Sequence, residues 1–187
     1  MKAEKKQTDR RIRRTQNNLK KALLSLLQTK NINEISIREL AELADINRGT
    51  FYLHYRDPYD LLRQLSEQFL SELQQLMEDN SHIGTYPSLC RLYHFIYTNH
   101  ELLHILLGVN GDILFQNSLE KMLIKNILEQ EMNTSSLNNY RTLEYYTTFV
   151  VSGWVAIIRN WLDNGMKESP EEIALMTMHI TGQLGSL

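Results

Sequence analysis

Apolar residues recur every three or four positions along most of the chain, the spacing that places them on one face of an α-helix. The first such run, from about Asp9 to Thr29, follows a charged segment, residues 1–7, that we expect to be a flexible basic arm. A second long run extends from Pro58 to about Glu78. Further runs predict five more helices, near residues 87–98, 100–107, 112–131, 137–163 and 170–184. Because no stretch alternates apolar and polar residues as a half-buried strand does, the chain is predicted to be all-α.

Two short helices are predicted between the first two long ones. Ser36 and Glu39 have the spacing of a capping box, in which each side chain bonds the backbone amide of the other residue at a helix start. After a polar turn at residues 45–47, a second short helix is expected from Arg48 to Tyr55. Two short helices joined by a tight turn and preceded by a basic helix are typical of a helix-turn-helix, whose second helix enters the major groove of DNA.

The charge distribution divides the chain into two parts. Residues 1–65 hold 14 Lys and Arg against 8 Asp and Glu, a net charge of +6, whereas residues 66–187 hold 6 against 14, a net charge of −8. A basic N-terminal third on an acidic body favours a nucleic-acid reader joined to another module. The single cysteine, Cys90, allows no intramolecular disulfide, and we see no signal peptide and no apolar run long enough to span a membrane. A cytoplasmic protein is therefore expected.

Two segments resemble a known family. The sequence ISIRELAELADINRGTFYLHYRDPYDLLRQL, residues 35–65, resembles the DNA-binding region of the TetR/AcrR family of transcriptional regulators. The sequence FVVSGWVAIIRNWLDNGMKESPEEIA, residues 149–174, is similar to the regulatory domain of a subgroup that includes regulators of dihydroxyacetone kinase operons. The resemblance implies an N-terminal three-helix DNA-binding domain over residues 1–55, and a helical ligand-binding and dimerisation domain over residues 56–187. The positions that match the DNA-binding pattern are Ile46, Gly49, Thr50, Phe51, Tyr52, His54, Tyr55, Asp60, Leu61 and Leu62.

The family resemblance also implies which residues contact a double-stranded DNA operator. Ser36 and Tyr55 would lie near backbone phosphates, and Phe51 would belong to the core. Pro58 stands where the family usually has a phosphate-contacting lysine, and Arg56 is the candidate to replace it. The residues that would face the major groove are Arg48, Gly49, Thr50, Tyr52, Leu53 and His54.

The second part of the chain is rich in aromatic residues, which indicate either a helical core or a pocket for a small-molecule effector. Around Phe149 to Ile158 the helix near 137–163 is apolar on nearly every side. One face, including Tyr146, Phe149 and Gly153, is therefore expected to pack inside its own domain, and the other to form a homodimer interface together with the helix near 170–184. The candidate pocket residues are Tyr93, Tyr97, His104, Phe115, Tyr146 and Phe149. The candidate interface residues are Val151, Val155, Ile158 and Leu162.

A competing interpretation comes from the pattern His-Glu-x-x-His at residues 100–104, which is typical of zinc hydrolases. Asn99 resembles a helix N-cap, which would put His100 at a frayed helix start, and Asn110 stands where the extended motif needs a third histidine. We therefore predict no metal, no cofactor and no catalytic residue. The leading hypothesis is a ligand-responsive repressor that binds DNA as a homodimer. An activator controlled by a protein coactivator and a zinc hydrolase are the alternatives.

Overall fold

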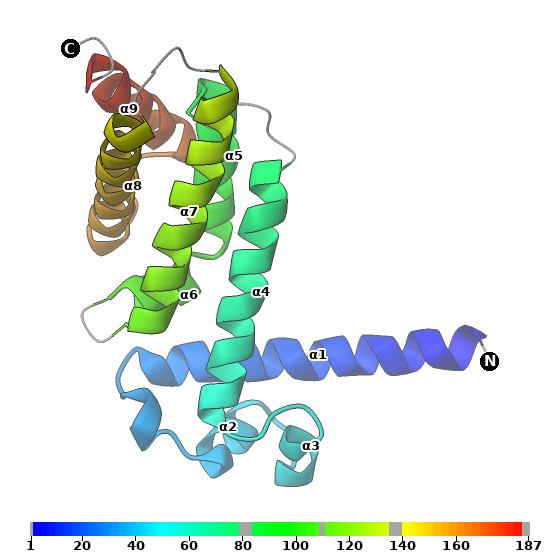
Figure 1. Ribbon diagram of the computed structural model, residues 1–187. Helices are drawn as coiled ribbons and strands as arrows, with labels where there is room; N and C mark the ends of the chain where they lie inside the picture. The colour runs from blue at the N-terminus through cyan, green and yellow to red at the C-terminus, as the bar shows by residue number, and fades with distance from the viewer. Residues whose placement is uncertain (1, 79–83, 109–110, 135–139, 185–187) are drawn as a thin grey trace. The chain divides into compact units, whose positions relative to one another are not determined.

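The computed structural model describes residues 2–78, 84–108, 111–134 and 140–184, and across these ranges it is built of α-helices without any strand (Figure 1). The predicted all-α class is therefore confirmed. No helix in these ranges is both long and apolar enough to cross a lipid bilayer. The helices are α1 (Lys2–Leu27), α2 (Ile37–Leu43), α3 (Arg48–Tyr52), α4 (Pro58–Glu78), α5 (Tyr86–Thr98), α6 (His100–Leu107), α7 (Ile113–Thr134), α8 (Tyr140–Asp163) and α9 (Pro170–Leu184), with one 3₁₀ turn at Ile32–Glu34.

The chain divides into two compact units, an N-terminal unit of Met1–Gln68 and a C-terminal unit of Phe69–Leu187. The division falls inside α4, so this helix contributes its first half to one unit and its second half to the other. The domain boundary predicted after residue 55 separates a DNA-binding part from a regulatory part, which is a division by function. The compact units do not test it, and it stays a prediction.

Two helix ends differ from the sequence-based expectation. Helix α1 begins at Lys2, so residues 2–7 are helical rather than a flexible arm, because the Lys, Ala, Glu and Gln in this segment are good helix formers. Helix α3 ends at Tyr52 rather than Tyr55. The reason is a tightened last turn, in which the backbone N–H of His54 donates to the carbonyl of Phe51, three residues back, at 2.9 Å.

The core of the N-terminal unit lies where α1, α2, α3 and the start of α4 meet. Leu19 and Leu23 of α1, Leu40 of α2, Phe51 of α3 and Leu61 of α4 are fully buried there. The side-chain amide of Asn18 also donates to the carbonyl of Ala44 at 3.2 Å, which ties α1 to the end of α2. Helix α1 thus braces the two short helices that follow it.

In the C-terminal unit, α5 packs closely along α9 and α7 along α8, and Figure 1 shows α8 and α9 side by side. Between α5 and α9 the buried hydroxyl of Tyr93 lies 2.6 Å from that of Thr177, which itself donates to the Ile173 carbonyl, so Tyr93 is the donor. Burial raises the pKa of Tyr93 to about 12, which keeps this donor protonated. The Trp161 indole N–H donates to the carbonyl of Glu168 at 3.1 Å and fixes the connection from α8 to α9.

The buried and exposed faces of α8 are the reverse of those predicted. Phe149, expected inside its own domain, is 60% exposed, and Gly153 is exposed too. The hydrophobic pattern did not determine which face of α8 is buried, because the segment is apolar on nearly every side. The buried face is the one that carries Trp154 and Trp161, since these large side chains bury the most surface. The four residues predicted for a dimer interface are instead buried inside their own unit: Val151, Val155, Ile158 and Leu162.

We expect Tyr93→Phe to lower the free energy of unfolding by about 1 kcal/mol, because it removes the buried hydrogen bond to Thr177 and keeps the ring. Urea unfolding followed by circular dichroism measures this change. Tyr97→Phe is the matched control, since the Tyr97 side chain is about half exposed and its loss of a hydroxyl should leave stability unchanged. Equal stability of the wild type and both variants would contradict the role given to this bond.

Candidate nucleic-acid interface

The first helix of the helix-turn-helix is fixed at its start by the predicted capping box. The Ser36 hydroxyl accepts from the Glu39 backbone N–H at 3.2 Å, and the Glu39 carboxylate accepts from the Ser36 backbone N–H at 3.0 Å. The Lys30 ammonium lies 2.5 Å from the same carboxylate. Hydrogen bonding to Lys30, and then to Ser36, lowers the pKa of Glu39 to about 2. The cap is therefore held by a carboxylate that stays ionised at neutral pH.

The turn between α2 and α3 depends on two unusual positions. Asp45 has a φ of +53°, a left-handed conformation that Asp tolerates better than most residues, and Ile46 then donates its N–H to the Ala41 carbonyl at 3.0 Å. Asn47 caps α3 by accepting from the Gly49 N–H at 2.6 Å. A Cβ atom on Gly49 would lie only 3.0 Å from that Asn47 oxygen. Gly49 thus has a structural role in the cap, which the sequence did not predict because the family resemblance implied only a position facing the major groove.

Helix α3 exposes most of its surface. Phe51 is its one buried residue, whereas Tyr52 is 61% exposed and the following Leu53 is 79% exposed. Arg48 and Gly49 are also exposed. Large side chains this open to solvent on a helix of five residues form a surface that a partner would be expected to cover. The two remaining candidates on this segment, Thr50 and His54, are half-buried.

Tyr55 does not lie where the family resemblance implied. Its ring is buried, with its centroid 5.8 Å from that of Phe51, and burial followed by the nearby Asp60 charge raises its pKa. The ring borders a polar cleft of about 630 Å³ between α1 and α4, with Arg13 and Gln64 among the other lining residues. Tyr55 is therefore a core residue, and the implied position beside a phosphate is corrected.

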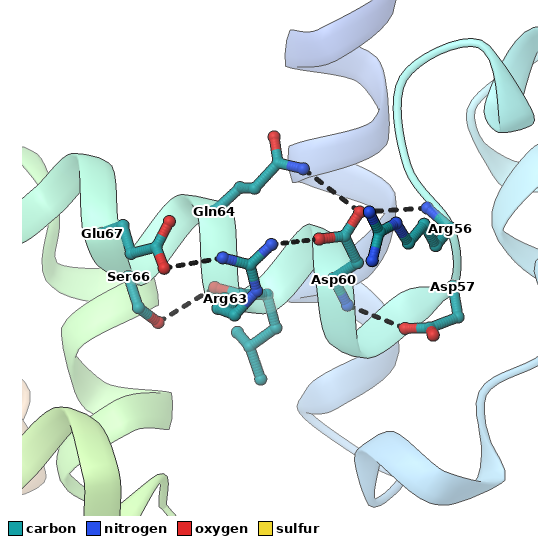
Figure 2. Close-up of polar contacts among 8 residues, drawn as sticks. Arg56, Asp57, Asp60, Arg63, Gln64, Ser66 and Glu67 are labelled. Carbon is teal, nitrogen blue, oxygen red and sulfur yellow. Dashed lines mark hydrogen bonds and ion pairs between the residues drawn. The ribbon is translucent and has the colours of Figure 1, made fainter.

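The segment that leads from α3 into α4 is organised by Asp57 and Asp60 (Figure 2). Asp57 caps α4 by accepting from the Asp60 N–H at 2.8 Å, and Asp60 accepts from the Arg56 backbone N–H at 3.0 Å. The Arg56 N–H, and then Arg63, lower the pKa of Asp60. Arg63 lies 2.5 Å from Asp60 and 2.7 Å from Glu67, so its charge is balanced within α4. Arg56 itself is exposed beside this network.

Positive charge also gathers on α1. Four arginines stand on its exposed surface within five residues: Arg10, Arg11, Arg13 and Arg14. On α2, by contrast, Arg38 is paired with Glu42 at 2.9 Å, one helical turn away. The exposed arginines of α1 and Arg48 of α3 thus present positive charge to a polyanion.

The six residues predicted to line a ligand pocket are divided between the core and the surface of the C-terminal unit. Two are buried in the core of the C-terminal unit, Tyr93 and Phe115. The other four are half-buried or exposed: Tyr97, His104, Tyr146 and Phe149. Aromatic residue type was the signal used for this set, and it does not distinguish rings inside a helical bundle from rings on its surface. The proposed set is therefore corrected.

The two histidines of the His-Glu-x-x-His pattern lie on α6, where His100 is the first residue and His104 belongs to the last turn. The Nδ1 atom of His100 lies 2.8 Å from the Tyr97 carbonyl, and the Nε2 atom of His104 lies 3.2 Å from the Asp163 carboxylate. Within the described ranges, no three His, Cys, Asp or Glu side chains lie close enough together to hold a metal ion.

Comparison with known proteins gives a consistent family assignment. Residues 85–183, more than half of the chain, match the family model TetR_C_8, described as a transcriptional regulator C-terminal region. The uncharacterized HTH-type transcriptional regulator YxbF of Bacillus subtilis (strain 168) is 25% identical over 182 residues, which cover 88% of this chain and 44% of that protein. The chain thus spans less than half the length of this relative.

Solved structures share the fold. The dihydroxyacetone kinase operon activator DhaS superposes with a TM-score of 0.62 at 19% identity, covering 91% of this chain and 95% of that one. A TetR transcriptional regulator from Streptococcus agalactiae 2603V superposes with a TM-score of 0.64 at 21% identity, covering 93% and 97%. With the family model matching more than half of the sequence, the chain belongs to the TetR family of transcriptional regulators.

Proposed function

We propose that this regulator binds a double-stranded DNA operator as a homodimer, with α3 of each copy in the major groove. The observation that carries the proposal is the exposed surface of α3. Within this helix only Phe51 is buried, where it anchors α3 to the core, and the Asn47 cap fixes the helix start. Residues 1–55 would read DNA, and residues 56–187 would regulate and dimerise.

The exposed residues of α3 have the chemistry that reading base edges requires. Arg48 can donate two hydrogen bonds to guanine, Thr50 and His54 can donate or accept, and Leu53 can contact a thymine methyl group. Tyr52, which is 61% exposed, can present both an apolar ring and a hydroxyl to DNA. Ser36 at the α2 cap and Arg56 before α4 are proposed to bind phosphates, with the α1 arginines adding sequence-independent attraction.

The proposed dimer uses the outer faces of α8 and α9, opposite to the face predicted from sequence. The exposed side chains there are unusually apolar: Tyr145, Phe149, Leu175, Met176 and Ile180. An apolar patch of this kind on two neighbouring helices is typical of a protein interface. The partner proposed for this patch is a second copy of the chain. One α3 reaches only one half of an inverted repeat, so reading both halves requires two copies.

The patch also contains a depression, formed by small residues, that could accept one of its large apolar side chains. Ser152, Gly153 and Ala156 are exposed and small, and a Cβ added to Gly153 would meet no atom within 4 Å. A groove of about 500 Å³ runs between α8 and α9 past Ala156 and Ile180. In a twofold contact, Phe149 of one copy would enter the depression of the other, so one surface supplies both parts.

Repression is the proposed mode of regulation, because occupying an operator blocks transcription without any further partner. A ligand that changes the spacing of the two α3 helices would relieve it. DhaS is by its name an activator, and activation through a protein coactivator is the alternative for this chain. Since the target is chromosomal DNA, we place the protein in the cytoplasm.

We expect Tyr52→Ala to weaken operator binding by about 1–3 kcal/mol without changing the melting temperature, because its exposed side chain leaves the core intact. Fluorescence anisotropy with the operator and differential scanning fluorimetry measure the two quantities. Tyr140→Ala, an equally exposed tyrosine in the C-terminal unit, is the control. A large drop in melting temperature for Tyr52→Ala, or unchanged operator affinity, would contradict the assignment.

Operator affinity should fall about 10³-fold between 50 and 200 mM salt if about six phosphates are neutralised. Replacing both Arg10 and Arg11 by Ala should make the slope of log affinity against log salt shallower, since both side chains are exposed on α1. The double change of Lys121 and Lys125 to Ala on α7 removes the same charge from the acidic unit and should leave the slope unchanged. Equal effects of both double variants would refute the electrostatic role of α1.

Ala156→Asp should weaken dimerisation more than tenfold, because the proposed contact would bury an unpaired carboxylate that the single chain leaves in solvent. Sedimentation velocity at micromolar concentration measures this effect. Asn117→Asp adds the same charge to an exposed position of α7 and should remain dimeric. A wild type that sediments as a monomer, or an Ala156→Asp variant as dimeric as the control, would rule out this interface.

A further inference from the structure

The polar cleft between α1 and α4 has a lining that the helix-turn-helix does not explain. Figure 1 shows α4 crossing α1, and every residue that lines the cleft belongs to the N-terminal unit. Its volume of about 630 Å³ falls within the range of about 300–1,000 Å³ that is typical of small-molecule sites. Such sites are usually mostly apolar, whereas here Leu65 is the one lining residue without a polar side chain. A ligand of this cleft would therefore be polar throughout.

The α1 wall of the cleft is a positively charged stripe. Arg13, Gln16, Asn17 and Lys20 follow the spacing of three, four and seven residues that places them on one face of the helix. Residues 10–27 of α1 contain no Asp or Glu. Across the described part of the chain, neither Arg13 nor Lys20 forms an ion pair. Two cations thus face the cleft without a carboxylate to balance them.

The carboxylate on the α4 wall is already balanced by its own helix. Glu67 is the one acidic residue that lines the cleft, and it lies 2.7 Å from Arg63. Arg63 also pairs with Asp60, to which the Gln64 side chain donates an amide N–H at 3.2 Å (Figure 2). The acids of this part of α4 are therefore not available to the two cations of α1. The charge left over in the cleft is positive, which favours an anionic ligand.

Tyr55 adds a recessed hydrogen-bond donor. The residue is only 6% exposed and borders the cleft, and its hydroxyl has no hydrogen-bond partner among the described residues. Burial, followed by the Asp60 charge, raises the pKa of Tyr55, so the hydroxyl stays protonated at neutral pH and can donate. The ring packs against Phe51, a role that phenylalanine would fill equally well. The hydroxyl is thus the part of Tyr55 that the fold leaves unused.

The charge, spacing and donors of the cleft together limit what it can bind. Arg13 and Lys20 are seven residues apart, about 10 Å along α1, so a ligand that reaches both carries several negative charges. Phosphate oxygens accept well from guanidinium, ammonium and phenol groups. The amides of Gln16 and Asn17 each offer a donor and an acceptor, which match a polar organic body. Phosphates of a duplex lie on a convex surface, whereas the Tyr55 hydroxyl is recessed, so a small molecule matches the cleft better than DNA does.

We propose that the α1–α4 cleft binds a small organic polyphosphate of about the size of a nucleotide. Its phosphates accept hydrogen bonds from Arg13, Lys20 and the Tyr55 hydroxyl, and its polar body bonds the amides of Gln16 and Asn17. The site rests on the proposed function only in its consequence for DNA. A bound polyphosphate occupies Arg13 and adds negative charge to the unit that would read the operator, so it lowers operator affinity.

Isothermal titration calorimetry of the full-length protein with ATP, at low salt and without DNA, tests the site. The expected result is saturable binding of one ATP per chain. Lys20→Gln should weaken this binding about tenfold, because it removes a charge-assisted hydrogen bond. Lys21→Gln is the matched control, since it removes the same charge from the next residue, which is exposed and does not line the cleft. The control should bind ATP nearly as tightly as the wild type.

Tyr55→Phe tests the recessed donor. ATP binding should weaken about threefold to tenfold, because one hydrogen bond to the ligand is lost. The melting temperature should stay unchanged, because the hydroxyl has no partner within the described protein. If Tyr55→Phe weakens binding of a duplex without the operator as much as that of ATP, the cleft is a contact for the DNA backbone and the proposed ligand class is wrong.

The two halves of ATP test the ligand class. Adenosine should not bind measurably, because it has no charge for the α1 cations. Inorganic tripolyphosphate should bind more weakly than ATP, because it has no polar body for the amides of α1. No saturable binding of ATP, equal binding by the Lys20→Gln and Lys21→Gln variants, or equal affinities of tripolyphosphate and ATP would overturn the inference.

Operator affinity with and without ATP, at matched ionic strength, separates this inference from the proposed function. ATP should lower the operator affinity of the wild type and of Lys21→Gln, but not that of Lys20→Gln. Normal operator binding in a protein that binds no ATP overturns the cleft site alone. ATP binding that depends on Lys20, in a protein that binds no operator, overturns the proposed function and leaves the cleft site standing.

Discussion

The burial of Phe51 is the interaction on which the DNA-facing surface depends. A helix of five residues is far too short to be stable by itself, so α3 exists because Phe51 is fixed in a core formed by Leu19, Leu40 and Leu61. With one residue buried, the others are free to point outward. The same core needs Tyr55 against Phe51, which is why that tyrosine is not available at the surface.

The two tryptophans of α8 differ in whether their buried indole N–H groups are hydrogen-bonded. Trp161 is hydrogen-bonded to the connection into α9, and Tyr93 and Thr177 bond α5 to α9. These bonds favour one rigid arrangement at the edge proposed for dimerisation. Around Trp154 the described core has two small cavities and an unpaired indole donor, so fewer contacts hold the side chains there.

The helix starts were predictable because their determinants are local. Ser36 with Glu39, and Ser169 with Glu172, make the reciprocal bonds that their three-residue spacing implies. Helix ends were less predictable. The last turn of α3 depends on how the Phe51 carbonyl is shared between the backbone N–H groups of His54 and Tyr55. The start of α1 depends on helix propensity, whereas the charge of residues 1–7 indicated a flexible arm.

The sequence by itself determined the all-α class, the caps, the basic helix-turn-helix and the family, because each of these depends on residues within a few positions of one another or on a motif of fixed spacing. Only the tertiary structure decided which face of α8 is buried. An apolar stretch such as residues 149–158 satisfies the helical period in more than one rotation, so the packing of Trp154 and Trp161 against neighbouring helices had to choose. The same holds for Tyr55 and for the aromatic residues of the second unit: a ring is equally apolar at the surface and in the core, and contacts distant in sequence determine where it lies.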